Sequence, residues 1–235
     1  MKYVIRFQKT GVICYTSHLD ILKVFKRSFK RAGIRLAYSQ GFNPHPKMGF
    51  AQPLSLGYES LDEYIEFEIV DVAEDGTNVR TDPQWILEQL RELMPEGLTL
   101  VSIQEATHPK TLAAITEAAE YSICIPLTGS GLGSLPDNAG AIWHEYMDRE
   151  EIIAFKKQKK KKEPVPVNIR PKIREITFYL AEGMLRIETC LDAGSDSNLS
   201  PELIISTFLE RFGLELPRSD IQVTRTKIHF KKILT

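Results

Sequence analysis

Apolar and polar residues alternate at the start of the chain, which predicts a β-strand over residues 2–8. The apolar spacing then changes to three and four, which predicts a helix over residues 17–32 with Gly33 as its C-cap. The core-facing stripe of this helix is expected to consist of Leu22, Phe25, Phe29 and Ala32. The chain therefore opens with a strand followed by an amphipathic helix.

The rest of the first half contains a second set of strand and helix patterns. Residues 63–70 alternate regularly, with Glu66 and Glu68 on one face and Ile65 and Phe67 on the other. The other predicted elements are an irregular strand at 47–56, a helix at 82–94 and a strand at 98–105. This order is β-α-β-β-α-β, the ferredoxin-like arrangement.

The second half is predicted to repeat this order with one extra strand. Its predicted elements are strands at 119–127, 150–156, 173–181, 184–191 and 221–230 and helices at 137–148 and 200–212. The fold class is accordingly α+β with two ferredoxin-like halves. We expect an N-terminal domain over 1–110, a C-terminal domain over 118–235 and a lysine-rich loop at 156–163 between two strands of the latter.

Charge is distributed unevenly along the chain. Residues 1–50 carry a net charge of +9, residues 51–150 carry −15 and residues 151–235 carry +5, although the whole chain carries only −1. Such segregation gives a molecule local electric fields that its total charge hides. A pI near neutrality therefore does not exclude a nucleic-acid site on this chain.

The remaining bulk properties exclude several classes of protein. Cys14, Cys124 and Cys190 are far apart and form no zinc or iron–sulfur motif, so we expect no metal site and no cofactor. No apolar run is long enough to cross a membrane, and the first residues do not resemble a signal peptide. We therefore expect a cytoplasmic protein.

The first candidate site combines the basic side of the 17–32 helix with the loop that follows. Lysine and arginine side chains on one rigid element suit a phosphate backbone, aromatic rings suit unpaired bases, and polar side chains suit base edges. The candidate nucleic-acid-binding residues are Lys23, Lys26, Arg27, Lys30, Arg31, Arg35, Tyr38, Gln40, Phe42, Asn43, His45 and Lys47. The alternative interpretation is a solvated helix face, with Phe42 in the core and prolines shaping a turn.

Histidines provide the second candidate. His18 and His45 could act as general bases near neutral pH, although neither lies in a recognised catalytic motif. A structural, hydrogen-bonded role is the alternative for each of them. The lysine run at 156–162 has two interpretations as well, a solvated loop or a nonspecific phosphate clamp. Nothing in the sequence requires an enzyme, and a non-catalytic role is favoured.

Several longer motifs carry a family resemblance. They are S-H-L-D at 17–20, R-A-G at 31–33, Y-S-Q-G-F-N-P-H-P-K at 38–47, F-A-Q-P-L-S-L-G-Y-E-S at 50–60 and V-N-I-R-P-K-I at 167–173. Together they resemble the radical-SAM-linked protein family, a bacterial domain of unknown function. This chain has Asn168 where that family more usually has aspartate, so a charge-dependent role is not expected there.

The resemblance implies a partner enzyme and an RNA context, but no particular reaction of this chain. Members are fused to a radical-SAM enzyme or encoded beside one, and this chain is similar to the stand-alone form. Neighbouring genes for ribosomal proteins and ribonucleases imply an RNA context. Tandem ferredoxin-like halves also occur in repeat-associated RNA endonucleases and tRNA pseudouridine synthases, which is an analogy of fold alone.

Three functional hypotheses follow from the sequence. The leading one is an accessory RNA-binding protein that acts with a radical-SAM enzyme in tRNA or rRNA modification or processing. The second is a protein adaptor of that enzyme without RNA contact. The third is a metal-independent enzyme that cleaves or modifies RNA with His18 and His45. The expected partners are the radical-SAM enzyme and RNA, and neither DNA nor a membrane is expected.

Overall fold

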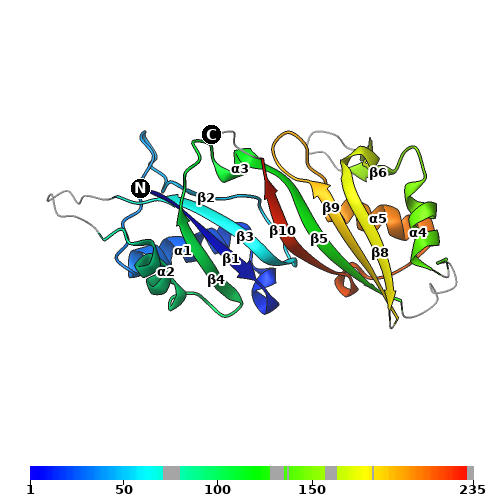
Figure 1. Cartoon of the computed structure of the whole chain (residues 1–235), viewed down its shortest axis with the longest axis horizontal. Coiled ribbons are helices and arrows are strands. Elements are labelled where there is room, and N and C mark those ends of the chain that lie inside the picture. Colours follow the sequence, from blue (N-terminus) through cyan, green and yellow to red (C-terminus); the bar gives the residue numbers. More distant parts are fainter. Residues whose placement is uncertain (71–79, 128–134, 137, 157–162, 182, 232–235) are drawn as a thin grey trace. The chain divides into compact units, whose positions relative to one another are not determined.

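The computed structural model describes all residues except 71–79, 128–134, 137, 157–162, 182 and 232–235. The chain forms two compact units (Figure 1). The first contains Met1–Thr116 together with the residues from Phe230 onward, and the second contains Glu117–His229. Among the described residues, no helix is long and apolar enough to cross a membrane.

The first unit has a ferredoxin-like sheet. Its main elements are β1 (Lys2–Lys9), α1 (His18–Arg31), β2 (Met48–Phe50), β3 (Glu59–Glu68), α2 (Pro83–Arg91), β4 (Leu98–Glu105) and the short α3 (Leu112–Ile115). The strands lie in the order β4-β1-β3, and β2 pairs with β3. β1 is antiparallel to both β3 and β4, and β2 is antiparallel to β3. The predicted β-α-β-β-α-β order is therefore confirmed for this unit.

One face of this sheet and the helices α1 and α2 enclose the core. Ile5 of β1, Phe25 of α1, Phe67 of β3 and Leu90 of α2 are all essentially inaccessible to solvent. The alternation predicted for residues 2–8 and 63–70 therefore places the expected residues inside. In α1, Ile21 is buried and Leu22 only partly buried, so the core stripe begins one position earlier than predicted.

The ends of α1 follow from local sequence. The hydroxyl oxygen of Ser17 accepts a hydrogen bond from the backbone N–H of Asp20, as an N-cap does. After the C-cap residue Ala32, Gly33 adopts a positive φ of 72°. A glycine adopts this conformation without the steric cost that a side chain would add, so the helix ends within one residue of the prediction, with Ala32 rather than Gly33 as C-cap.

The second unit repeats the arrangement. Its elements are β5 (Thr116–Pro126), α4 (Ala139–Met147), β6 (Ile153–Lys156), β7 (Val165–Asn168), β8 (Ile173–Ala181), β9 (Met184–Asp192), α5 (Pro201–Phe212) and β10 (Gln222–Phe230). The strand order is β10-β5-β9-β8, which matches the order in the first unit. Aromatic contacts among Tyr146, Phe178 and Phe208 join α4, β8 and α5 in one core.

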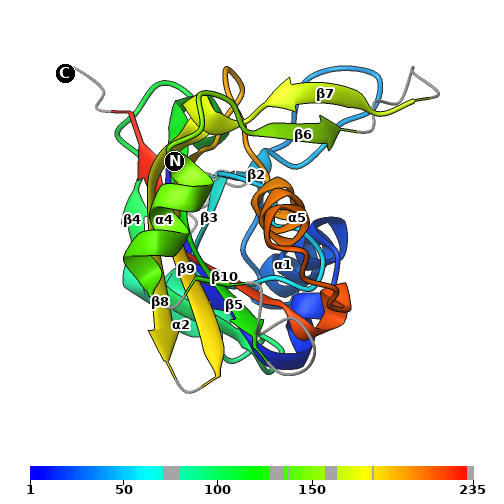
Figure 2. The same ribbon diagram turned by 90° about the vertical axis from the view of Figure 1, so that its right-hand side faces the viewer.

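The extra strand of the second half is one arm of a separate hairpin. β6 pairs with β7 in a two-stranded sheet, seen as a ribbon in Figure 2. The sequence predicted a strand at 150–156, and the partner at 165–168 was not predicted because Pro164 and Pro166 interrupt its pattern. Most of the lysine-rich loop lies outside the described residues.

Candidate functional site

The five basic residues of α1 form an exposed surface that we call the basic face. It consists of Lys23, Lys26, Arg27, Lys30 and Arg31, all exposed to solvent. Apolar side chains fill the opposite side of the helix, so the cations are directed away from the core. Arg35, just beyond the helix, is also exposed.

One member of the basic face has a carboxylate partner. The ammonium nitrogen of Lys23 lies 2.8 Å from a carboxylate oxygen of Asp20. Hydrogen bonds from Lys23 and Ser17 lower the pKa of Asp20 below its ordinary value, so this carboxyl stays ionised. Within the described parts of the chain, Lys26, Arg27, Lys30 and Arg31 form no ion pair. Four cations of α1 thus carry charge that no described carboxylate neutralises.

The loop after α1 is a narrow hairpin, which we call the 38–46 loop. Tyr38 and Pro46 form an isolated antiparallel bridge, and the backbone N–H of Ser39 donates to the carbonyl of His45 over 2.8 Å. The Ser39 hydroxyl in turn accepts a hydrogen bond of 3.0 Å from the N–H of His45. These bonds fix the base of the loop, while Gln40 and Asn43 are exposed near its tip.

Phe42 at the tip of this loop is fully exposed, at 103% of its reference area. The interpretation that places Phe42 in the core is therefore wrong. Its neighbour Gly41 has a φ of 131°, which lets the chain reverse here. A large aromatic side chain without apolar contacts loses hydrophobic stabilisation, so such a position is more typical of binding than of folding.

The structure separates the two candidate histidines. His18 lies beside Glu63 in a small pocket, whereas Lys47, which follows His45 closely, pairs with Glu68. Glu63 lies in the middle of β3 and Glu68 at its end, about 16 Å apart at the rise of a β-strand. The two imidazoles therefore cannot act together on one reacting atom, and each has to be considered alone.

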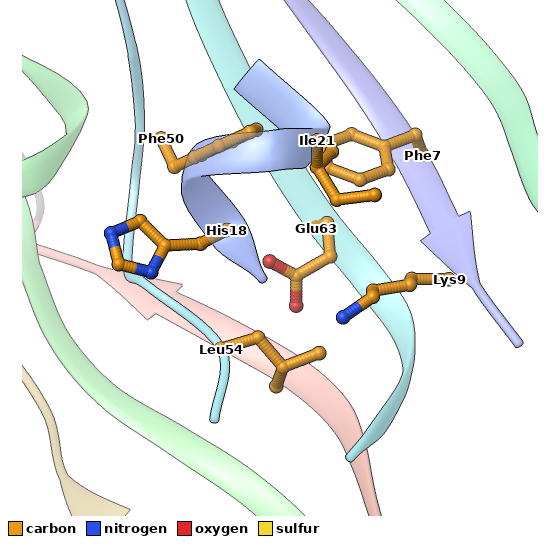
Figure 3. Close-up of a pocket in the computed structure, with 7 residues that line it drawn as sticks. All are labelled: Phe7, Lys9, His18, Ile21, Phe50, Leu54 and Glu63. Atoms are coloured by element: carbon orange, nitrogen blue, oxygen red, sulfur yellow. The ribbon is translucent and has the colours of Figure 1, made fainter. Parts of the chain in front are cut away.

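The His18 pocket lies at the N-terminal end of α1 (Figure 3). Its interior of about 20 Å³ holds about one water molecule. The side chains of Lys9 and Glu63 extend into the same space, and both residues are almost completely buried. The ammonium group of Lys9 donates to the carbonyls of Cys14 and Thr16, over 3.0 and 2.8 Å. Lys9 therefore fastens the turn that leads into α1.

Two motif segments that are far apart in sequence meet in this pocket. His18 belongs to S-H-L-D, and Phe50 and Leu54 belong to F-A-Q-P-L. Lys9 and Glu63 were not predicted as site residues, although the sequence contains a signal for them. Each occupies a strand position in phase with the core residues, where a charged side chain is unusual. The small volume suits structural anchoring of the motif better than it suits binding of a ligand.

Comparison with known proteins identifies a family and a fold. A family model described as "Uncharacterized protein conserved in bacteria (DUF2344)" matches residues 2–201. Among curated proteins, the comparison finds no match.

Among solved structures, a chain of "Crystal Structure of a Cbf5-Nop10-Gar1 Complex" aligns with 98% of this chain at 13% identity and a TM-score of 0.54. This chain spans 50% of the length of that one, and the similarity supports the α+β fold alone. A second structure, "Crystal Structure of an Unknown Protein from Galdieria sulphuraria", aligns at 12% identity, over 95% of this chain and 96% of that one, with a TM-score of 0.27.

Proposed function

We propose that this chain, which belongs to the family of uncharacterized proteins conserved in bacteria (DUF2344), is an RNA-binding accessory protein. Its partner would be a radical-SAM enzyme that modifies or processes tRNA or rRNA. The observation that carries the RNA part of this proposal is the basic face of α1. Its cations lie along one rigid helix over about 12 Å at the helical rise.

A rigid row of cations suits phosphates for a physical reason. Each lysine or arginine that contacts a phosphate releases condensed counterions, which favours binding whatever the base sequence. Lys26, Arg27, Lys30 and Arg31 are free of described ion pairs, so no internal partner has to be displaced first. The basic face would therefore position the RNA backbone, and the choice of sequence has to come from other groups.

The 38–46 loop supplies groups of that second kind. The exposed ring of Phe42 can stack on an unpaired base, and stacking tolerates every base because all bases have a π-face. Asn43 and His45 lie beside it and offer donors and acceptors to base edges or to the ribose hydroxyl. Support for the radical-SAM partner comes from the motifs at 17–60 that resemble the radical-SAM-linked family.

The adaptor is a second candidate because of the same exposed aromatic ring. An aromatic side chain at a protein–protein interface often contributes much of the binding energy. Phe42 could therefore anchor the chain on the partner enzyme rather than on RNA. Co-purification of the partner with wild type and with Phe42→Ala, in parallel with RNA titrations, separates these two functions.

Fluorescence anisotropy against tRNA and rRNA fragments at two salt concentrations tests the main proposal. The variant Lys26→Glu with Arg27→Glu should weaken binding and lower the salt slope by about 1.4, since each single-strand phosphate contact contributes about 0.7. The matched control is Arg186→Glu with Lys227→Glu, which makes the same charge change at exposed positions of the second unit. Equal RNA affinity of the wild type and the Lys26/Arg27 variant would refute the proposal.

A further inference from the structure

A groove on the first unit lies between the edge strand β2 and the short helix α3. Its volume is about 360 Å³, which lies in the range of small-molecule sites. The polar residues that line it come from β1, from β3 and from the positions directly before β2 and α3: Lys2, Lys47, Glu66, Glu68 and Thr111. Of these, only Lys47 was selected from the sequence.

Strand register explains why these side chains meet. Gly49 of β2 pairs with Glu66 of β3, and Lys2 of β1 pairs with Glu68. Directly paired residues of neighbouring strands direct their side chains to the same face of a sheet. The alternate residues of β3, such as Phe67, are buried in the core under α1 and α2. The groove therefore lies on the face of the sheet opposite to those helices.

Charge in the groove is balanced in pairs. The ammonium nitrogens of Lys2 and Lys47 lie 2.7 Å from carboxylate oxygens of Glu66 and Glu68, respectively. The groove thus has little net attraction for a free anion or a free cation. A neutral ligand that offers a donor beside an acceptor would fit this pattern better than either ion.

Glu66 offers a ligand a hydrogen-bond acceptor in the groove. Its side chain is only 9% exposed, and its Oε1 accepts a hydrogen bond of 3.0 Å from the backbone N–H of Leu112. Its Oε2 lies 2.7 Å from the Lys2 ammonium and is therefore already ion-paired. A carboxylate oxygen has more than one lone pair, so a ligand N–H could donate to Oε2 beside that ammonium.

Gly49 leaves the space that such a ligand would occupy. A Cβ atom added at Gly49 would meet no other atom within 4 Å. Its backbone lies in β2, in an ordinary strand conformation, so glycine is not required there for conformational reasons. The missing side chain therefore keeps the groove open directly beside Glu66.

We propose that the groove binds one unpaired nucleobase through its exocyclic amino group, with cytosine as the best match. The cytosine N4 amino group would donate to Oε2 of Glu66, a pairing of carboxylate and cytosine that also occurs in base readout. The adjacent N3 and O2 of the base would accept from the ammonium groups of Lys2 and Lys47. This inference rests on the proposed RNA function, because it assigns a base-reading site to an RNA whose phosphates the basic face holds.

Cytidine and uridine monophosphate form a matched pair of probes for this site. The two bases differ at the N4 amino group against the O4 carbonyl, and in the proton on N3. Amide NMR spectra of the full chain, titrated with each nucleotide, should show shifts at Gly49 and Glu66. Cytidine monophosphate should reach half-saturation at a concentration about tenfold lower than uridine monophosphate.

Two variants test whether the nucleotides bind in the groove. Gly49→Val should occupy the space beside Glu66 and abolish the shifts, while Thr99→Val, at an exposed position of β4, should leave them unchanged. Glu66→Gln should remove the preference for cytidine, because an amide can place its N–H₂ donor where Oε2 now accepts. Thermal unfolding of each variant confirms that it is folded. The comparison of the two nucleotides on wild type needs no variant.

The outcomes separate this inference from the proposed function. Equal binding of the two nucleotides by wild type, or a cytidine preference that persists in Gly49→Val, overturns the groove assignment. Mononucleotides can occupy the groove without the basic face, so this result does not depend on the Lys26/Arg27 variant. If cytidine monophosphate binds at Gly49 but the Lys26/Arg27 variant binds RNA as tightly as wild type does, the groove assignment stands and the basic-face proposal is refuted.

Discussion

Lys9 of β1 and Glu63 of β3 both occupy core-facing positions of paired strands, and both are almost completely buried beneath the start of α1. The ammonium group of Lys9 donates to the carbonyls of Cys14 and Thr16, which belong to the turn before the helix. This buried cation therefore connects the sheet to the segment that carries S-H-L-D. The S-H-L-D motif therefore begins directly after a turn that a buried ammonium group holds, in addition to apolar packing.

Replacing this cation should destabilise the first unit. Lys9→Met keeps the length of the side chain but removes the two hydrogen bonds to Cys14 and Thr16, at a cost of about 2–4 kcal/mol of unfolding free energy. Urea unfolding measures the loss. Lys23→Met is the control because its ion pair with Asp20 is exposed to solvent and should contribute little to stability. Equal stability of both variants would show that Lys9 is not an anchor.

Periodicity predicted most of the fold because the core residues recur at every second position of the strands, as at Tyr3, Ile5 and Phe7 of β1. The faces of residues 2–8 and 63–70 were assigned correctly, and the order of elements followed from them. The β7 strand was not predicted because proline hides strand periodicity, although an edge strand tolerates proline.

The candidate site was harder to predict because it depends on distances between elements. His18 begins α1 and His45 lies in the loop after it, so the helix separates them. His18 lies beside Glu63, whereas Lys47, two residues after His45, pairs with Glu68. The groove at Glu66 could not be predicted for the same reason. The alternating pattern placed Glu66 and Glu68 on one face, but only the strand pairing brings Lys2 and Gly49 beside them.

Asn168 has a structural role that needs no charge. Its side-chain oxygen accepts hydrogen bonds from the backbone N–H groups of Ile152 and Arg170, over 3.1 and 3.0 Å. Asn168→Asp keeps both bonds and should change stability little, whereas Asn168→Ala leaves two N–H groups unsatisfied and should cost about 1–3 kcal/mol. Thermal unfolding of the three proteins checks this. A large loss in Asn168→Asp would instead point to a role for the side-chain N–H₂ group.

The ion pair between Arg174 and Asp192 should make stability depend on pH. Burial alone would raise the pKa of Asp192, but hydrogen bonds from Arg174 and Ser197 outweigh it and hold that pKa below its ordinary value. The stabilisation is therefore present above about pH 4, the ordinary pKa of aspartate, and is lost as the pH falls through the lowered value.

The variant Asp192→Asn tests this linkage. It should be less stable than wild type in urea at pH 6, and the difference between the two proteins should shrink as the pH falls from 4.5 towards 3. Asp220→Asn is a suitable control, because Asp220 is exposed and its carboxylate accepts from the Ser219 hydroxyl rather than from a cation. A constant difference between wild type and Asp192→Asn at all pH values would mean that the carboxylate charge contributes nothing.

Phe42 has a fully exposed ring at the tip of the 38–46 loop. Because the ring makes no apolar contact that folding needs, Phe42→Ala should change the unfolding free energy by less than about 0.5 kcal/mol. If the ring stacks on a base, the same substitution should weaken RNA binding by about 1–3 kcal/mol. Anisotropy titrations measure this, with Phe155→Ala as a control because Phe155 is also exposed, on β6. Unchanged RNA affinity together with loss of the co-purified enzyme would assign the ring to a protein interface instead.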